Sequence, residues 1–258
     1  MAAQSAPDAA DVPAAFSLDG RRALVTGARG GIGRAIAVAL AAAGAEVVLH
    51  GHHDDLDATA ALVASAGALG GTWVQDLRDG AGVESGAREL LDRGPVDVLV
   101  NNAATISRRP VEEIDFALWQ RHFAVNVDAA WLLTRTLGAA MIDRGGGKVL
   151  MVGSLLSVQG GVDRAAYAAS KHALLGMVRA LSNEWAEHNV QVNALAPGYV
   201  ATERPSPAIG DPALLARIPA GRWGTPADVA GPAVFLASRA SDYVSGHLLA
   251  VDGGWLSR

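Results

Sequence analysis

Short apolar runs alternate with longer helical stretches along almost the whole chain, and this alternation restricts the fold more than any other feature. Runs typical of buried strands occur at 23–26, 46–50, 72–74, 97–101, 148–152, 191–196 and 247–251. Helical patterns fill the gaps, including those at 32–43, 55–66, 116–144 and 165–187. Near-continuous apolar strands separated by helices are typical of a parallel sheet covered on both faces. The sequence therefore predicts a doubly wound α/β fold with about seven parallel strands.

The length of 258 residues fits one large domain, which we place at 16–258 because no linker or repeat interrupts it. The first fifteen residues are rich in Ala and Pro, and we expect them to form a flexible tail. They lack the basic start and the apolar stretch of a secretory signal. The longest apolar runs are far shorter than the ~20 residues that cross a bilayer. We therefore expect a cytoplasmic protein.

Composition excludes several kinds of chemistry. The chain has no cysteine, so disulfides, thiolate metal sites and a cysteine nucleophile are ruled out. Its formal net charge of −5 argues against sequence-independent binding of nucleic acid. A His-His-Asp-Asp run at 52–55 has zinc-ligand residue types, but a solvated turn is the better interpretation. We expect no metal and no membrane partner.

A glycine-rich turn lies between the first predicted strand and the first predicted helix, at Thr26-Gly-Ala-Arg-Gly-Gly-Ile-Gly33. Glycines at such a turn let the backbone approach a pyrophosphate, which then sits at the helix N-terminus among unpaired N–H groups. A glycine cluster alone is a weak signal. Its position at the start of a βαβ unit makes it a prediction of dinucleotide binding.

A tyrosine and a lysine with catalytic potential lie four residues apart in the helical segment 165–187. Tyr167 and Lys171 therefore share one helix face. A nearby ammonium favours the phenolate of a tyrosine, whose pKa is otherwise about 10, so the pair forms a proton donor or acceptor near working pH. Ser154 ends the fifth predicted strand, and its hydroxyl can bond a carbonyl or alcohol oxygen of a substrate.

The glycine-rich turn resembles that of the short-chain dehydrogenase/reductase family, and further motifs of this family follow in order over nearly the whole chain. They are Asp76, Asn101-Asn102-Ala103, Asn126, Ser154, Tyr167-Ala-Ala-Ser-Lys171, Pro197-Gly198 and Thr202. Ala104 stands where the family usually has glycine, and Arg29 lies one place before the basic residue of NADP-preferring members. The resemblance implies a Rossmann-type fold and reversible hydride transfer between a nicotinamide and an alcohol or ketone.

The resemblance also implies residue roles. Ser154, Tyr167, Lys171 and Asn126 form the expected catalytic set, in which Asn126 holds a water that links the lysine to solvent. Residues expected along the pyrophosphate and ribose are Gly27, Gly31, Ile32 and Gly33. Those expected around the adenosine are Asp76, Leu77, Asn102 and Ala103. Those expected at the nicotinamide and its ribose are Val200, Thr202, Tyr167 and Lys171. Asp76 is expected to accept a hydrogen bond from the adenine amino group.

The choice between NAD and NADP depends on the end of the second strand. NAD enzymes often place a carboxylate there, whereas NADP enzymes use a basic residue. The usual acidic position is Gly51, followed by His52 and His53. Arg29 and the histidines favour NADP, while the Asp54-Asp55 pair would repel a 2′-phosphate. Because histidine is mostly neutral at pH 7, the sequence favours NAD(H), with NADP(H) as the alternative.

The C-terminal half resembles the branch of this family that acts on keto-deoxy sugar acids in bacterial uronate breakdown. The stretches that carry this resemblance are 154–161, 183–189, 196–202, 217–224, 240–246 and 251–258. It implies chemistry on a sugar acid such as 2-dehydro-3-deoxy-D-gluconate, and tetramers are usual in the family. A carboxylate substrate needs a cation and polar side chains. The candidates are Arg108, our first choice, then Gln159, Arg164, Arg217 and Arg222.

Three other functions stay open at this point. The first is reduction of the alginate-derived keto-sugar 4-deoxy-L-erythro-5-hexoseulose uronate, which is chemically very close. The second is reduction of a 3-oxoacyl group on an acyl carrier protein, which would need a basic docking face. The third is a regulator that binds NAD without catalysis on the same fold. A regulator would not need to retain Ser154, Tyr167, Lys171 and Asn126 together.

Overall fold

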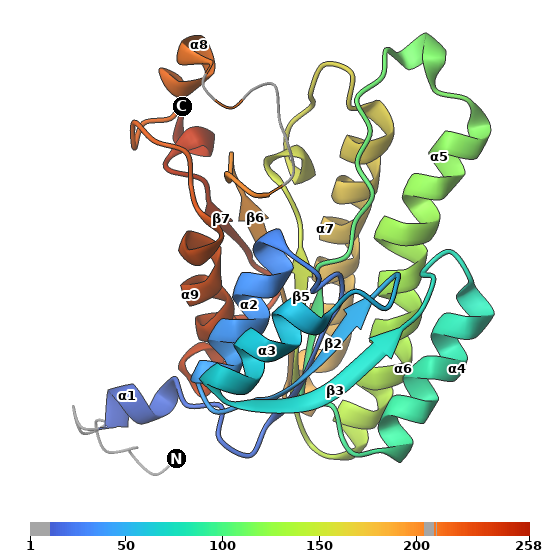
Figure 1. Cartoon of the computed structure of the whole chain (residues 1–258), viewed down its shortest axis with the longest axis vertical. Coiled ribbons are helices and arrows are strands. Elements are labelled where there is room, and N and C mark those ends of the chain that lie inside the picture. Colours follow the sequence, from blue (N-terminus) through green and yellow to red (C-terminus); the bar gives the residue numbers. More distant parts are fainter. Residues whose placement is uncertain (1–10, 204–208, 210) are drawn as a thin grey trace.

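Seven parallel strands form the centre of the computed structural model, which describes residues 11–203, 209 and 211–258. The strands are β1 (Arg22–Val25), β2 (Glu46–Gly51), β3 (Ala68–Val74), β4 (Val98–Asn101), β5 (Gly147–Val152), β6 (Val190–Pro197) and β7 (Leu248–Val251). They lie side by side in the order β3-β2-β1-β4-β5-β6-β7, each parallel to its neighbour. The predicted α/β class and parallel sheet are confirmed (Figure 1).

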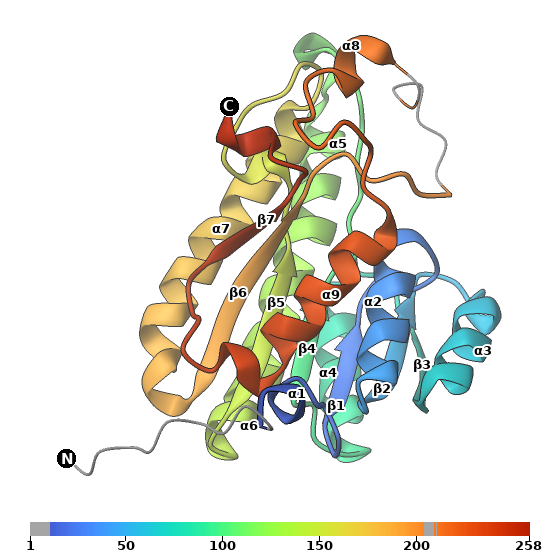
Figure 2. The same cartoon turned by 90° about the vertical axis from the view of Figure 1, so that its left-hand side faces the viewer.

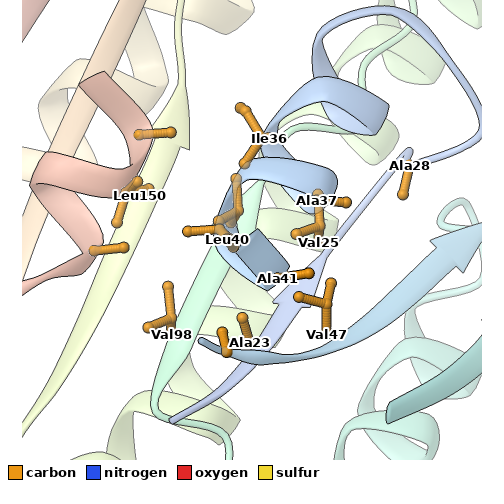
Figure 3. Packing of buried hydrophobic residues seen from close by; sticks show 14 of the residues in the cluster. Ala23, Val25, Ala28, Ile36, Ala37, Leu40, Ala41, Val47, Val98 and Leu150 are labelled. Atoms are coloured by element: carbon orange, nitrogen blue, oxygen red, sulfur yellow. The ribbon is translucent and has the colours of Figure 1, made fainter. Parts of the chain in front are cut away.

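One face of the sheet is covered by α2 (Gly31–Ala42), α3 (Asp57–Ala66) and α9 (Pro226–Ala237), as Figure 2 shows. Ile36 and Leu40 lie one turn apart on α2, so both point to the sheet, where they are fully buried. Figure 3 shows them in one cluster with Val25 and Val98 of the central strands. Ala37 and Ala41 of α2 are buried as well.

The other face is covered by α4 (Gly80–Asp92), α6 (Ala129–Asp143) and α7 (Ala165–Trp185), with α5 (Phe116–Phe123) beside α7. The buried residues of these helices and the strand side chains beneath them form a second apolar cluster. A sheet with apolar clusters on both faces explains why the strands read as continuous apolar runs. Among the described residues, no helix has the length and apolar character needed to span a membrane.

The strand order reverses between β1 and β4, and this reversal positions a site. From β1 the chain proceeds outward to β2 and β3, then returns to β4 on the other side of β1. The chain therefore passes from β1 to a helix on one face of the sheet and from β4 to helices on the other face, so that a crevice forms at the carboxyl edge. Ligands of open α/β sheets bind in the crevice at such a switch point.

The region 116–144, predicted as one long helix, is interrupted. α5 passes into a five-residue π-turn, η2 (Ala124–Asp128), before α6 begins. The helical sequence pattern continues through this turn, so periodicity could not reveal the wider winding. Single π-turns inside α-helices often occur at functional sites.

Two further expectations need correction. β3 begins at Ala68 and not near Thr72, because Ala68, Leu69 and Gly71 already pair with β2, and the register shift at Val47/Val48 skips the residue between Leu69 and Gly71. Of the predicted tail, Asp11–Ala15 forms the short helix α1. Next to it, Phe16 packs on Phe235 of α9 with ring centroids 6.3 Å apart. The rest of the predicted tail, residues 1–10, lies outside the described residues.

The remaining helices are short. They are α8 (Pro212–Leu215) and the 3-10 turns η1 (Val111–Glu113), η3 (Leu155–Ser157), η4 (Ala186–His188), η5 (Arg239–Ser241) and η6 (Trp255–Ser257). The loop before α5 and the segment that carries α8 both rise above the carboxyl edge of the sheet (Figure 1). Residues of both segments, such as Ala103 and Thr202, line a cleft at this edge.

Candidate active site

The glycine-rich turn lies between β1 and α2, where its glycines are required by space and by backbone geometry. Gly27 has φ +64°, and a Cβ there would lie 2.8 Å from the Ala103 Cα atom after β4. A Cβ on Gly33 would lie 2.3 Å from the Gly27 carbonyl oxygen. The turn is thus packed against the β4 loop, and its N–H groups stay accessible at the start of α2.

Thr26 and Asn102 fasten the β1 turn to the β4 loop. The Thr26 Oγ1 accepts hydrogen bonds from the backbone N–H groups of Asn102 and Ala103, at 2.9 and 3.0 Å. The Asn102 amide donates to the carbonyl oxygens of Thr26 and Gly27, at 2.8 and 3.1 Å. Asn102 was predicted to lie beside the adenosine ribose. Its side chain also holds the β1 turn and the β4 loop together, which the sequence did not predict.

His50 is a residue of this site that the sequence analysis missed. It is only 2% exposed at the end of β2. Its Nδ1 accepts a hydrogen bond from the Gly27 N–H at 3.2 Å, and its Nε2 donates to the Gln75 carbonyl at 3.0 Å. One imidazole thus joins the glycine-rich turn to the end of β3. The sequence did contain a signal for His50, because a polar residue at the end of an otherwise apolar strand is unusual.

A cleft of about 870 Å³ opens at this edge of the sheet. Predicted cofactor residues that line it are Gly27, Arg29, Gly31, Ile32, Gly33, His52, Asp76, Leu77, Asn102, Ala103 and Thr202. Residues in the lining that the sequence analysis did not single out include Arg34, Arg78, Arg121, Val125 and Glu203. The cleft combines unpaired backbone donors, basic side chains and enough volume for an extended anionic ligand. These residues fit a dinucleotide.

Asp76 and its neighbours form one wall of the cleft. The Arg78 guanidinium grips the Asp76 carboxylate through Nε and Nη2, with N···O distances of 2.6 to 3.0 Å. Hydrogen bonds from the Arg78 side chain, together with one from its backbone N–H, lower the pKa of Asp76 to about 2. The carboxylate is therefore ionised at neutral pH and can accept further hydrogen bonds.

Charges at the end of β2 are paired across the cleft mouth. Arg29 Nε lies 2.7 Å from the Asp55 carboxylate, so the basic group of the glycine-rich turn is opposed by an acid. His52 Nδ1 lies 3.7 Å from the Asp76 carboxylate. No group of His, Asp or Glu in the described part of the chain is arranged to hold a metal ion.

Lys171 is buried on α7 beneath the cleft. Its side chain is 2% exposed, and Nζ donates a hydrogen bond to the Val152 carbonyl at 2.7 Å, where β5 ends. Nζ lies 5.7 Å from the Tyr167 ring centroid on the same helix face. Burial lowers the pKa of Lys171 to about 8, because the charged form is poorly solvated. The structure thus brings together the predicted Tyr-Lys pair.

Asn126 reaches the same helix from the π-turn. Its amide nitrogen donates to the Ser170 hydroxyl at 2.9 Å and to the Thr105 carbonyl at 3.0 Å, while its oxygen accepts from the Thr105 N–H at 2.7 Å. Ser170 in turn donates to the Tyr167 carbonyl at 2.7 Å. The π-turn therefore places Asn126 between the loop after β4 and the helix that carries Tyr167.

Ser154 follows β5 and caps the 3-10 turn η3. Its Oγ accepts a hydrogen bond from the Leu156 N–H at 3.1 Å, and its own N–H donates to the Ser157 hydroxyl at 3.1 Å. With the oxygen fixed in this way, the hydroxyl hydrogen can be directed at another acceptor. Ser154 thus follows directly on the end of β5, the strand whose Val152 carbonyl accepts the hydrogen bond from Lys171.

The predicted substrate residues have different surroundings, and none of them is among the described residues that line the cleft. Arg108 is mostly exposed and lies 3.7 Å from the Asp163 carboxylate. Gln159 is half-buried just after η3. Arg164 precedes α7 and donates to the Ser107 carbonyl at 2.9 Å. Arg217 instead stacks on the Trp255 ring, 4.3 Å from its centroid.

Two other predicted residues lie on the segment after β6. Val200 forms an isolated bridge with Gly224 and packs on the apolar cluster beneath α2 and α9. Thr202 lies over the glycine-rich turn, since a Cβ added to Gly31 would meet its methyl at 3.3 Å. Arg222, the last arginine considered, is held by two 2.8 Å bonds to Asp228.

The parallel sheet and the cleft at its carboxyl edge together are those of a dinucleotide-binding oxidoreductase. The family model described as enoyl-(acyl carrier protein) reductase matches residues 27–256. This chain belongs to the short-chain dehydrogenase/reductase family, whose members are NAD(P)-dependent oxidoreductases. The predicted family resemblance is confirmed.

Several relatives within this family are similar to the chain over nearly its whole length. The chain is 47% identical over 248 residues to 2-dehydro-3-deoxy-D-gluconate 5-dehydrogenase of Bacillus subtilis, with 95% of this chain and 98% of the relative covered. A Beutenbergia cavernae crystal structure with NADP bound at low occupancy is 51% identical, with a TM-score of 0.91 over 95% of this chain and 100% of that one. Gluconate 5-dehydrogenase of Burkholderia cenocepacia, solved with NADP and tartrate, is 38% identical, with a TM-score of 0.90 and coverage of 95% and 99%.

The His50 bridge predicts a pH dependence of stability. Burial, the main cause, and the nearby His52 lower the pKa of His50 from 6.5 to about 4, although its bond to Gln75 opposes the shift. Since the unfolded chain binds this proton first, the stabilisation is complete above about pH 6.5 and is lost as the pH falls to about 4. The full loss is roughly 3 kcal/mol, at about 1.4 kcal/mol per pH unit.

Urea unfolding of the wild type and of His50→Gln between pH 4 and 8 measures this contribution. We expect the wild type to lose the extra stability below pH 6.5, and His50→Gln to lack that part of the pH dependence. His53→Gln, which removes an exposed imidazole nearby, should behave as the wild type. An unchanged pH dependence in His50→Gln would contradict the assignment of this loss to His50.

Proposed function

We propose that this chain catalyses reversible, NAD-linked interconversion of a hydroxyl and a ketone on a keto-deoxy sugar acid, as 2-dehydro-3-deoxy-D-gluconate 5-dehydrogenases do. The observation that carries the proposal is the 47% identity to the Bacillus enzyme over nearly the full length of both chains. The Ser154, Tyr167 and Lys171 arrangement supports it, because oxidation of a secondary alcohol requires a group that accepts the hydroxyl proton.

The bound nicotinamide would supply the hydride chemistry, and this chain's residues would move the proton. We assign to Tyr167 the exchange of a proton with the reacting oxygen. Lys171 favours the phenolate of Tyr167 through its positive charge. Ser154 donates its hydroxyl hydrogen to the same substrate oxygen. Asn126 holds the backbone of Thr105 and the hydroxyl of Ser170, and thereby keeps α7 in register with the loop after β4.

The wider setting follows from the same proposal. We place the reaction in uronate degradation in the cytoplasm, and we propose a homotetramer, as is usual in the family. Phe116 on α5 and Trp131 on α6 are large apolar side chains that are 71% and 41% exposed in the single chain. Exposed apolar side chains of this size are candidates for burial between subunits.

A substrate panel tests the proposed function. Purified protein is assayed at about 340 nm, where reduced nicotinamide absorbs, with keto and hydroxy sugar acids, neutral polyols and ketoses, and a 3-oxoacyl thioester. We expect kcat/KM for 2-dehydro-3-deoxy-D-gluconate to exceed that for neutral substrates by about tenfold or more, from one charge-assisted bond. Preference for the alginate-derived uronate, for the thioester, or absence of turnover would replace the proposal by the corresponding alternative.

We further propose that the cofactor preference is for NAD(H), on the basis of charges at the end of β2. Arg29 is the basic group of the glycine-rich turn, yet its Nε is paired with Asp55 at 2.7 Å. A 2′-phosphate near Arg29 would have to displace or tolerate this carboxylate, whereas a ribose hydroxyl carries no charge. The Beutenbergia and Burkholderia structures contain NADP and therefore do not support a preference for NAD(H). The proposed preference rests on the Arg29–Asp55 ion pair of the present chain.

Asp55→Asn tests this reasoning. The substitution should tighten NADPH binding by roughly two- to fivefold, the size expected for an exposed charge interaction, and leave NADH binding unchanged. Asp54→Asn, which removes the same charge one residue earlier, is the matched control and should have the smaller effect. Fluorescence titration of both cofactors gives the dissociation constants. Tighter binding of NADPH than NADH by the wild type would contradict the NAD preference.

A further inference from the structure

Arg164 stands out among the arginines that the sequence analysis named as candidates for binding the substrate. It lies three residues before Tyr167, and its guanidinium is partly buried. Nη1 donates to the Ser107 carbonyl, but no carboxylate lies within ion-pair distance of Arg164 anywhere in the described ranges. A partly buried guanidinium without a paired anion is costly in the unliganded protein, and an incoming anion would relieve that cost.

The charges around Arg164 favour an anion. Burial lowers the pKa of Arg164, the neighbouring Arg108 guanidinium lowers it further, and Tyr167, Tyr199 and Asp163 oppose the shift. Two guanidinium groups thus lie near one another, while Asp163 is 3.7 Å from the Arg108 Nε. One carboxylate cannot balance two cations. The remaining positive charge lies near Tyr167, the proposed proton-transferring residue.

We propose that Arg164 binds the carboxylate of the sugar-acid substrate, and that Ser107 and His122 hold the Arg164 side chain in position for it. This inference rests on the proposed function, and it identifies Arg164 as the residue that makes the enzyme prefer acidic substrates to neutral ones. A guanidinium can meet a carboxylate with two hydrogen bonds, which fixes the orientation of the substrate as well as its charge.

His122 supplies the fixed point of this arrangement. It lies on α5 with no exposed surface. Its Nδ1 donates to the Leu118 carbonyl at 2.9 Å, because a carbonyl can only accept. Its Nε2 is therefore left as an acceptor, and the Ser107 hydroxyl lies 3.1 Å from it. The Ser107 carbonyl, on the same residue, accepts from Arg164.

The loop that carries Ser107 is also fixed on its other side. Asn126 lies one helical turn after His122 and binds both the N–H and the carbonyl of Thr105. The Arg109 N–H donates to the Asp163 carbonyl at 3.0 Å, which ties this loop to the one before Arg164. The Ser107 carbonyl therefore belongs to a loop held by hydrogen bonds on both sides, and it is already in position to accept the hydrogen bond from Arg164. Side chains held in this way lose less conformational entropy on binding a ligand.

Arg164→Met tests the subsite with substrates of equal length and different charge. Wild type and variant are compared on a keto-deoxy sugar acid and on a neutral six-carbon polyol. We expect kcat/KM for the acid to fall by about tenfold or more, mainly through KM, as for the loss of one charge-assisted hydrogen bond. The neutral polyol should be unaffected, and Arg164→Lys should recover part of the loss. Arg109→Ala removes an exposed arginine from the loop that carries Ser107, and as the control it should leave kcat/KM for both substrates unchanged.

Ser107 and His122 are positioning residues, and their test uses the same two substrates. Ser107→Ala and His122→Leu should each raise KM for the acid by about threefold, with kcat and the neutral polyol unchanged. The double variant should show no larger effect than either single variant, because both remove one hydrogen bond. Ser107→Ala leaves the helix packing intact, so it remains a test if His122→Leu fails to fold.

A binding measurement separates failure of this inference from failure of the proposed function. The protein loaded with NADH cannot oxidise D-gluconate, so calorimetric titration with D-gluconate and with D-glucitol reports binding alone. Tighter binding of the acid by the wild type, lost in Arg164→Met, supports the subsite even if no sugar acid is turned over. Equal losses for acid and polyol, or unchanged binding of the acid in Arg164→Met, would overturn it. Turnover of sugar acids with an unaffected Arg164→Met would leave the proposed function standing.

Discussion

The hydrogen bond between the buried Lys171 ammonium and the Val152 carbonyl is the interaction on which the arrangement of the proposed catalytic residues depends. A charged group with 2% exposure is unstable unless it is hydrogen-bonded, and the Val152 carbonyl at the end of β5 provides that bond. The bond fixes α7 against the carboxyl edge of the sheet. Tyr167, one turn earlier, and Ser154, just after β5, are thereby brought to the same edge. Because the ammonium is poorly hydrated, its field acts strongly on the nearby phenol.

The two ends of the site are joined through the loop after β4. At its start, Asn102 and Thr26 bind this loop to the glycine-rich turn. Further along, Asn126 binds Thr105 and connects the loop to α7 through Ser170. The cofactor cleft and the Tyr-Lys pair are therefore parts of one hydrogen-bonded unit. The strand reversal between β1 and β4 makes this possible, because it leaves a crevice where a loop from each side can meet.

Much of this could be predicted from sequence, for reasons that particular residues make clear. Tyr167 and Lys171 are four residues apart, and helical geometry alone places them on one face. The glycine-rich turn could be located because it follows a buried strand. The π-turn could not be predicted, since Ala124–Asp128 has the same helical pattern as its flanks. His50 could have been noticed as a polar residue at the end of a buried strand, but its bonds to Gly27 and Gln75 could not, because only the fold brings these groups together. The bond of His122 to the Ser107 hydroxyl could not be predicted for the same reason.

The most direct test of the account is the pH dependence of alcohol oxidation by the wild type, Lys171→Met and Tyr167→Phe. We expect wild-type kcat/KM to rise through a pKa well below the value of about 10 for free tyrosine, and Lys171→Met to move this pKa upward. Tyr167→Phe should bind cofactor almost normally and lose about a hundredfold or more in turnover. Wild-type turnover in Tyr167→Phe would contradict the assignment of proton transfer to this residue.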